Sequence, residues 1–146
     1  MGFANLDDLL AIENKIKWED RDLPSTLFGL LSRTAQSFPN RPAVSYQILS
    51  GPKDKAETLT WSELHKKTVQ AANMFRSLGV GSDDVVAYIL PNANETVLTL
   101  LGGAIAGIAN PINPLLDPEQ IGAILRETNA NVVVTMKAFP KSDVDQ

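Results

Sequence analysis

The residues best placed to act on a ligand form a short turn, Pro91-Asn92-Ala93-Asn94, between an apolar run at residues 84–90 and a stretch of helical character. If the run is a parallel strand, the turn lies at its carboxyl end, where open α/β sheets place ligands and where free backbone N–H groups attract anions. Asn94 is also a suitable N-cap for the following helix, and this structural role is favoured over ligand binding. Tyr88 and Asn113 lie near other predicted strand ends and are interpreted in the same way.

Two glycine-containing segments could suggest phosphate binding, but their spacing argues against it. Ser50-Gly51-Pro52-Lys53 lacks the Gly-x-x-x-x-Gly-Lys-Ser/Thr pattern of a phosphate loop and no helix follows it, so we interpret it as a hairpin tip. Gly102-Gly103 with Gly107 does not fit Gly-x-Gly-x-x-Gly, and it falls inside and at the end of a predicted helix. Close helix packing is the favoured explanation of this glycine pair.

The titratable side chains do not form a convincing catalytic group. His65 is the single histidine and stands beside two lysines, with no Ser or Cys at a spacing that suggests catalysis, which favours a solvated surface histidine. Asp7-Asp8 occupies consecutive helix positions, which do not share a face, and Asp83-Asp84 follows Gly79-Val80-Gly81 in a predicted turn. The sequence therefore assigns no catalytic, cofactor-binding or metal-binding residue.

Composition excludes several classes of function. Thirteen Lys and Arg against 17 Asp and Glu give a net charge of -4 without a basic cluster, so nucleic acid is not expected as a partner. The absence of cysteine excludes disulfides, thiolate metal sites and a cysteine nucleophile. The first residues are acidic where a secretory signal needs positive charge, and Leu6 stands where a myristoylation signal needs Ser or Thr.

The most apolar stretch, residues 97–109, is shorter than the ~20 residues of a membrane helix and contains three glycines. We interpret it as a buried helix and expect a cytoplasmic chain without a transmembrane segment.

The first part of the chain predicts two helices and a hairpin. A helix is predicted over residues 6–16, and a second over 26–38 with Ser25 as its N-cap and two prolines beyond its end. Residues 43–49 alternate between apolar and polar side chains, and residues 57–60 can pair with them across a polar loop.

From residue 60 onward, predicted helices and strands alternate. The capping box Thr60-Trp61-Ser62-Glu63 begins a helix that Gly79 ends, and residues 84–90 form a strand covered on both faces. The remaining predicted elements are helices at 95–106 and 118–128, the second capped by Asp117, and strands at 109–113 and 132–135. Strands separated by helices of this length are parallel with right-handed crossovers, which predicts a doubly wound sheet of three strands with helices on both faces.

The predicted sheet is incomplete. The strand at 132–135 is strongly apolar, and an exposed edge of this kind would invite aggregation. We therefore expect the chain to be a piece of a larger domain or to pair with another chain.

Four segments of the chain match one known family in their order and approximate spacing. They are Thr60-Trp61-Ser62-Glu63-Leu64, residues 78–87 (LGVGSDDVVA), Leu90-Pro91-Asn92, and residues 106–114 (AGIANPINP). With them, residues 43–135 resemble the opening of the large domain of the adenylate-forming (AMP-binding) superfamily, which includes acyl-CoA synthetases, firefly luciferase and peptide-synthetase adenylation domains. The last segment is more similar to the fatty-acyl-CoA synthetases.

The resemblance implies a two-step reaction. A carboxylate attacks the α-phosphate of MgATP to give an acyl adenylate and pyrophosphate, and the thiol of coenzyme A then displaces AMP. The family stabilises this chemistry with a Ser/Thr/Gly-rich loop ending in Pro-Lys-Gly, an acidic residue on the ribose and a lysine of a small C-terminal domain, none of which has a counterpart here. Lys137 and Lys141 follow the last strand, where some relatives contact the coenzyme A nucleotide, a role that is not favoured for them.

The sequence thus predicts the N-terminal portion of an ATP-dependent acyl-CoA synthetase of fatty acid metabolism. Residues 1–42 would be a helical segment, 43–135 the first part of the AMP-binding large domain, and 136–146 a tail. The full-length enzyme would use ATP, Mg²⁺ and coenzyme A with a fatty or other carboxylic acid, whereas this chain alone would bind none of them and be inactive. The alternative is a non-catalytic α/β module that binds a partner or self-associates through its open sheet edge.

Overall fold

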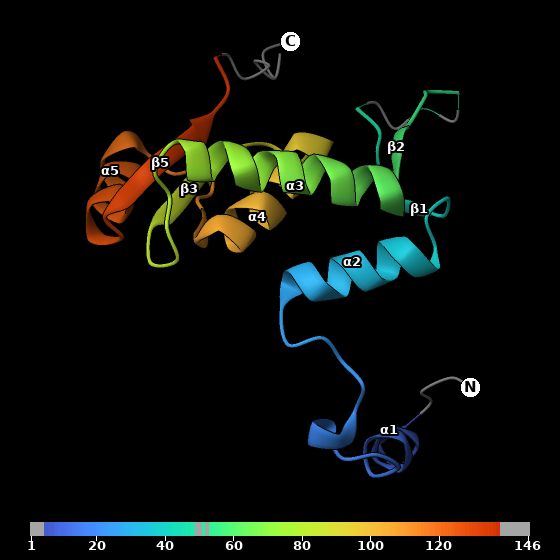
Figure 1. Cartoon of the computed structure of the whole chain (residues 1–146). Coiled ribbons are helices and arrows are strands. Elements are labelled where there is room, and N and C mark those ends of the chain that lie inside the picture. The colour runs from blue at the N-terminus through green and yellow to red at the C-terminus, as the bar shows by residue number, and fades with distance from the viewer. Residues whose placement is uncertain (1–4, 49–50, 52, 138–146) are drawn as a thin grey trace.

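The computed structural model describes residues 5–48, 51 and 53–137, which form helices, a hairpin and a parallel sheet (Figure 1). In chain order the helices are α1 (Leu6–Glu13), the 3-10 turn η1 (Trp18–Asp20), α2 (Leu27–Ser37), α3 (Trp61–Ser77), α4 (Asn94–Ala106) and α5 (Pro118–Glu127). The strands are β1 (Pro42–Tyr46), β2 (Glu57–Thr60), β3 (Val85–Ile89), β4 (Ile108–Pro111) and β5 (Ala130–Thr135). The predicted mixed α/β architecture and its element order are confirmed.

An antiparallel hairpin, β1–β2, precedes the main sheet. The second strand has the predicted bounds, but the first ends at Tyr46 instead of extending to residue 49. The strand ends early because the Gln47 side chain donates to the carbonyl oxygens of Gly51 and Asp54. These hydrogen bonds turn the chain into the β1–β2 connection. Leu49 lies outside the described residues.

β3 is the central strand of the parallel sheet, which has the order β4-β3-β5. Val86, Ala87 and Tyr88 of this strand are all buried although successive side chains point to opposite faces. The prediction from the nearly continuous apolar run, a strand that is covered on both faces, is therefore confirmed.

Helices cover both faces of this sheet. Val86 and Ala109 face α4, because a Cβ atom on Gly103 of α4 would lie 3.3 Å and 3.5 Å from their Cβ atoms. Asn110, the next residue of β4, faces the other side, where its amide donates to the Thr128 hydroxyl just beyond α5 at 3.3 Å. Helices α4 and α5 therefore lie on opposite faces, as a doubly wound sheet requires.

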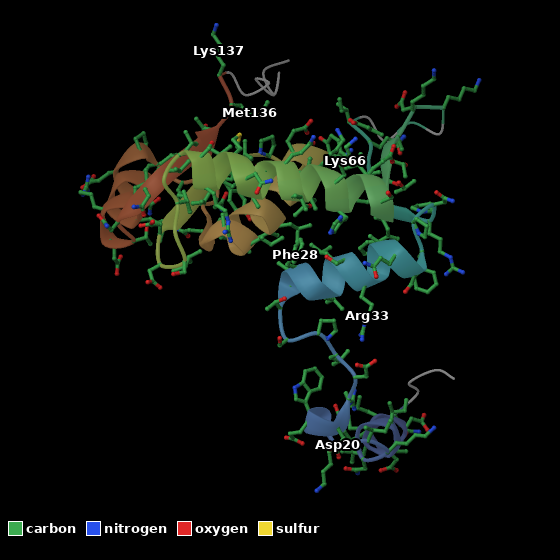
Figure 2. The ribbon with its side chains drawn as sticks, in the orientation of Figure 1. Asp20, Phe28, Arg33, Lys66, Met136 and Lys137 are labelled. Atoms are coloured by element: carbon green, nitrogen blue, oxygen red, sulfur yellow. The ribbon has the colours of Figure 1, made fainter. Side chains whose placement is uncertain are left out.

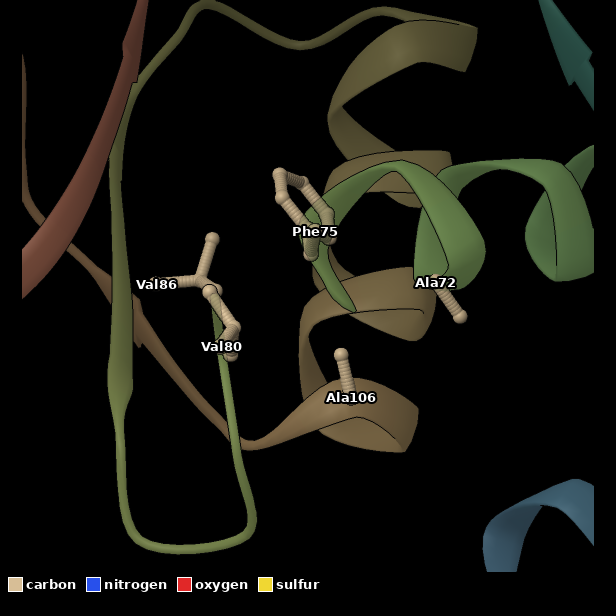
Figure 3. Close-up of a cluster of buried hydrophobic side chains, with 5 residues drawn as sticks. All are labelled: Ala72, Phe75, Val80, Val86 and Ala106. Atoms are coloured by element: carbon tan, nitrogen blue, oxygen red, sulfur yellow. The ribbon is translucent and has the colours of Figure 1, made fainter. Parts of the chain in front are cut away.

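The main hydrophobic core lies between α3, α4 and β3 (Figure 3). Phe75 and Val86 are completely buried, and the cluster is completed by Ala72, Val80 and Ala106. Each fully buried side chain of the size of Val or Phe contributes about 1.5–3 kcal/mol from removal of apolar surface from water. This cluster is therefore the main source of stability for the sheet and the two helices on it.

A smaller cluster joins helix α2 to the hairpin and α3. Leu31, Leu59 and Leu64 are its buried members. In contrast, α1 has no buried residue, and it lies apart from the sheet in Figure 1.

Two helix boundaries differ from the prediction. Thr26, not Ser25, caps α2, because its extended backbone lets the hydroxyl accept from the N–H of Gly29, three residues on, at 3.0 Å. Helix α1 ends at Glu13 instead of residue 16, since a short helix without tertiary packing has little to extend it.

The predicted capping box of α3 is confirmed and provides a stability test. The Thr60 hydroxyl accepts from the Glu63 N–H at 3.3 Å, and the Glu63 carboxylate accepts from the Thr60 N–H at 2.9 Å. We expect Thr60→Ala to lower the free energy of unfolding by about 1 kcal/mol in urea titrations followed by circular dichroism. The same titration of Ser62→Ala, an exposed neighbour, is the control and should be nearly unchanged.

The capping box also has an expected pH dependence. The backbone hydrogen bond from Thr60, followed by the bond from its hydroxyl, lowers the pKa of Glu63 below the ordinary value of 4.5. A lowered folded pKa gives stability that is present above the unfolded pKa and is lost as the pH falls through the folded value. The difference in free energy of unfolding between the unchanged protein and the Glu63→Gln variant should therefore shrink as the pH falls below 4.5. Parallel dependences of this free energy on pH in the two proteins would contradict this.

Candidate functional site

The carboxyl edge of the parallel sheet is where the chain reverses its winding direction. β3 leads through α4 to β4 on one side, and α5 then returns the chain to β5 on the other side of β3. Ile89 of β3 pairs with Thr135 of β5, so the residues that follow both strands lie at the same edge. Open α/β sheets usually bind ligands in the crevice at such a reversal, which makes this edge the candidate site.

The turn after β3 lies at this edge, but Asn94 does not cap the following helix. Ala93 holds the N-cap position without a side-chain hydrogen bond, and Asn94 is the first residue of α4. The Asn94 side chain is 3% exposed, and its amide donates to the carbonyl oxygen of Glu57 in β2 at 3.2 Å. The predicted cap is therefore wrong, because a contact with a strand distant in sequence uses the side chain instead.

Two residues that the sequence did not single out shape this turn. The Thr96 hydroxyl donates to the carbonyl oxygen of Pro91, and the main chain of Glu57 holds Asn94. Thr96 carries a local signal, since Ser and Thr side chains often bond nearby backbone groups. The Glu57 contact spans 37 positions and has no such signal.

Tyr88 and Asn113 have structural contacts at the same edge. Tyr88 is 6% exposed, and burial raises the pKa of its phenol, which stays protonated at neutral pH. The Asn113 side chain accepts from the N–H of Leu115 at 2.9 Å and turns the chain, so β4 ends at Pro111 and does not reach residue 113. Neither residue presents a reactive group.

The opposite, amino edge of the sheet is tied together by Asp84 and Asn131. The Asp84 carboxylate accepts from the N–H of Gly81 at 2.7 Å and from the Asn131 amide at 2.8 Å. Asn131 in turn accepts from the N–H of Val85 at 2.9 Å. The predicted turn at Asp83-Asp84 is confirmed, and Asp84 links that turn to β5.

The glycines fill packing positions. A Cβ atom on Gly102 would lie 2.6 Å from the Cβ of Ala71 in α3, and one on Gly107 would overlap the carbonyl oxygen of Asp84. The predicted close helix packing is confirmed. Gly51 lies in the β1–β2 connection, where its N–H donates to Asp54 at 2.9 Å, while Ser50 and Pro52 lie outside the described residues.

His65 is not the solvated surface histidine that the sequence favoured. It is half-buried between α3 and α2, with its Nε2 atom 2.9 Å from the Ser32 hydroxyl and its ring centre 5.7 Å from that of Phe28. The prediction failed because Ser32 lies 33 positions away and reaches His65 only through helix packing. Among the described residues no ion pair joins His65 to a carboxylate, so the third group of a nucleophilic triad is missing.

The residues that follow β5 also lie at the carboxyl edge of the sheet. Met136 and Lys137 project from the end of this strand (Figure 2), and Lys137 is exposed; Lys141 lies outside the described residues. Within residues 5–48, 51 and 53–137, no group of three or more His, Cys, Asp or Glu could hold a metal ion. No helix of this same part of the chain is both long and apolar enough to cross a membrane.

Comparison with known proteins identifies the class to which this architecture belongs, that of the AMP-binding, adenylate-forming fold. The family described as "AMP-binding enzyme" matches residues 31–146. The chain therefore belongs to the AMP-binding enzyme family, and its relatives include acyl- and aryl-CoA ligases.

Two curated relatives and one solved structure illustrate the similarity. Marinolic acid–CoA ligase of Pseudoalteromonas sp. (strain SANK 73390) is 33% identical over 132 residues, which cover 90% of this chain and 20% of that protein. 4-Coumarate–CoA ligase 1 of Arabidopsis thaliana is 29% identical over 111 residues, 75% of this chain and 19% of that protein. The crystal structure of the anthranilate CoA ligase AuaEII with anthranoyl-AMP has a TM-score of 0.66 at 26% identity and covers 82% of this chain and 22% of that one. The chain thus spans about a fifth of the length of these relatives.

Proposed function

We propose that the polypeptide to which this chain belongs is an acid–CoA ligase that forms AMP, and that its substrate is a fatty or other apolar carboxylic acid. The observation that carries this proposal is the family match over residues 31–146 together with relatives named as acid–CoA ligases. The similar structure that contains anthranoyl-AMP supports an acyl adenylate as the intermediate.

The proposed reaction has two displacement steps. A carboxylate oxygen attacks the α-phosphorus of ATP, the bond to the β,γ-diphosphate breaks, and pyrophosphate leaves with the bonding electrons. The thiolate of coenzyme A then attacks the carbonyl carbon, and AMP leaves. Both steps need stabilisation of negative charge as it develops on phosphoryl and acyl oxygens.

The contribution of this chain to that reaction is the first part of the sheet and its carboxyl edge. The chain contains no Pro-Lys-Gly segment, the end of the phosphate loop that the family resemblance implies. The described residues provide no group of three metal-ligating side chains, so Mg²⁺ is assigned to none of them. We therefore assign no catalytic residue here and propose that the chain alone is inactive.

The proposal extends to organisation and location. Residues 1–42 would form an N-terminal helical segment, 43–135 the first part of the AMP-binding domain, and 136–146 a tail. We also propose a cytoplasmic location, a compartment that supplies both ATP and coenzyme A. Self-association through the edge of β5, where Val133 is 44% exposed, remains the alternative prediction for the isolated chain.

The test compares this chain with the longer polypeptide in one assay. Each is incubated with ATP, coenzyme A, Mg²⁺ and a panel of fatty and aryl acids, and AMP, pyrophosphate and acyl-CoA are separated by chromatography. We expect the longer polypeptide to release AMP and acyl-CoA in equal amounts, and the 146-residue chain to release neither above the protein-free blank. Acyl-CoA from the short chain would contradict its inactivity, and ADP from the longer one would contradict AMP formation.

A further inference from the structure

A groove on the helical face of the molecule is built around Arg76. Three adjoining hollows of about 410, 210 and 330 Å³ are all lined by Arg76 of α3 and Ile105 of α4. The first and third also share Ala104, and the second and third share Phe28 of α2. The hollows thus form one continuous surface feature between α2, α3 and α4.

This groove is separate from the candidate site at the carboxyl edge of the sheet. Its largest hollow is lined by Val80, Gly81 and Gly107, which precede β3 and β4. Because parallel strands share one direction, these residues lie at the amino edge, the end opposite to the turn after β3. A ligand here would not occupy the crevice assigned to the proposed reaction.

The walls of the groove combine apolar surface with one positive charge. Phe28, Val69 and Ala72 line the second hollow beside Ile105. Figure 2 shows Phe28 projecting from α2 toward the layer formed by α3 and α4. Arg76 is the charged residue common to all three hollows, and the linings contain no Asp or Glu.

The Arg76 guanidinium is held at the groove and has no carboxylate partner. Its Nη2 atom donates to the carbonyl oxygen of Ile105 at 3.3 Å. Within the described residues the ion pair that the structure contains joins Arg33 to Asp22, so no carboxylate lies within 4.0 Å of Arg76. A guanidinium has five N–H donors in a planar fork that suits a carboxylate, and one bond to a carbonyl leaves donors for a ligand.

We propose that this groove is an accessory binding site for a small monocarboxylate with an apolar tail, such as a medium-chain fatty acid. The carboxylate pairs with Arg76, and the tail lies along Phe28, Val69 and Ile105. The match is one of charge and shape, since Arg76 supplies one cation and the second and third hollows beside it have mainly apolar walls. The proposal does not rest on the proposed function, because the site binds the acid without reaction and needs no ATP.

The N-terminal arm, residues 5–25, is the competing occupant. It carries exposed apolar side chains, among them Leu6, Ile16 and Trp18. However, Arg33 of α2 holds Asp22 of the arm through an ion pair at 3.4 Å and a hydrogen bond to its carbonyl oxygen at 2.6 Å. Arg33 lines none of the three hollows, and the arm runs from α2 away from α3 and α4 (Figure 1).

The test is photoaffinity labelling with octanoic acid that carries a diazirine at the end of its chain. The protein is irradiated without ATP, and labelled peptides are mapped by mass spectrometry. We expect saturable labelling of peptides that contain Phe28, Val69 or Ile105, and competition by unlabelled octanoate. Arg76→Gln should weaken labelling by about fivefold, the effect of losing one partly exposed ion pair, and Ala104→Trp should block it by filling the groove.

Matched controls make the result specific to a carboxylate in this groove. Lys66→Gln removes a charge from the same helix outside the groove, and it should leave labelling unchanged. The primary amide of the probe should label the groove weakly, and circular dichroism confirms that each variant is folded. Equal labelling by acid and amide, insensitivity to Arg76→Gln, or labelling that appears only after removal of residues 1–20 would overturn the proposal, the last by identifying the arm as occupant.

Discussion

Replacement of Phe75 by alanine should strongly destabilise the protein. The Phe75 side chain is 0% exposed and packs with Val80, Val86 and Ala106 in the core between α3, α4 and β3. Truncation of a buried aromatic residue to alanine removes about 3–5 kcal/mol, through lost burial and the cavity that remains. Since small domains are stable by only about 5–15 kcal/mol, this one change removes a large share of the total.

The measurement is a urea titration of Phe75→Ala followed by circular dichroism, with Met74→Ala as its control. Met74 is the preceding residue of the same helix and is 49% exposed, so its truncation should change the free energy of unfolding by about 0.5 kcal/mol or less. Both substitutions place alanine in the same helix, so the helix propensity of the introduced residue is the same in both. Equal midpoints for both would show that the core between α3 and β3 does not carry the stability assigned to it.

The parts of the fold that the sequence predicted well are those that local chemistry determines. The capping boxes at Thr60 and Asp117 satisfy backbone N–H groups with side chains three residues away, so their pattern is complete in the sequence. Gly79 ends α3 with a φ of 92°, a conformation that glycine adopts without steric penalty. The apolar run of β3 reports burial on both faces directly.

The errors arose where a distant segment competes for a side chain. Asn94 has the composition of a cap, but the carbonyl oxygen of Glu57 receives its amide, and no rule of local spacing includes β2. His65 has charged neighbours in sequence, yet α2 brings Ser32 and Phe28 against it. In both cases tertiary packing supplied a partner that overrides local preference.

The same distinction separates the candidate site at the carboxyl edge from the Arg76 groove. The turn after β3, at the candidate site, was predictable, because Pro91 interrupts an apolar run at the end of a strand. The Arg76 groove was not, since it forms only when residues of α2, α3 and α4, separated widely in sequence, line the same surface. A single exposed arginine in a helix carries no signal of its surroundings.

Replacement of Gly102 by alanine should destabilise the protein although alanine is the better helix former. A Cβ atom at this position would lie 2.6 Å from the Cβ of Ala71 and 3.1 Å from the backbone nitrogen of Ala72. One of these atoms is a Cβ and the other is a backbone nitrogen, so neither can rotate away. The steric overlap can be removed only if α3 and α4 move apart. Overpacking of this kind lowers the free energy of unfolding by about 1–3 kcal/mol. Because the contacting atoms cannot rotate away, we expect this loss to outweigh the helix-propensity gain of about 1 kcal/mol.

Gly122→Ala is the matched control, because Gly122 also lies inside a helix, α5. The nearest atom to its added Cβ would be Nη1 of Arg126, at 3.2 Å, the far end of a flexible side chain that can move away. We therefore expect Gly122→Ala to raise the free energy of unfolding by about 0.5–1 kcal/mol while Gly102→Ala lowers it, in parallel thermal and urea denaturation. Opposite signs would locate the requirement for glycine in the contact between α3 and α4. A stabilised Gly102→Ala variant would mean that these helices tolerate a wider separation than the structure shows.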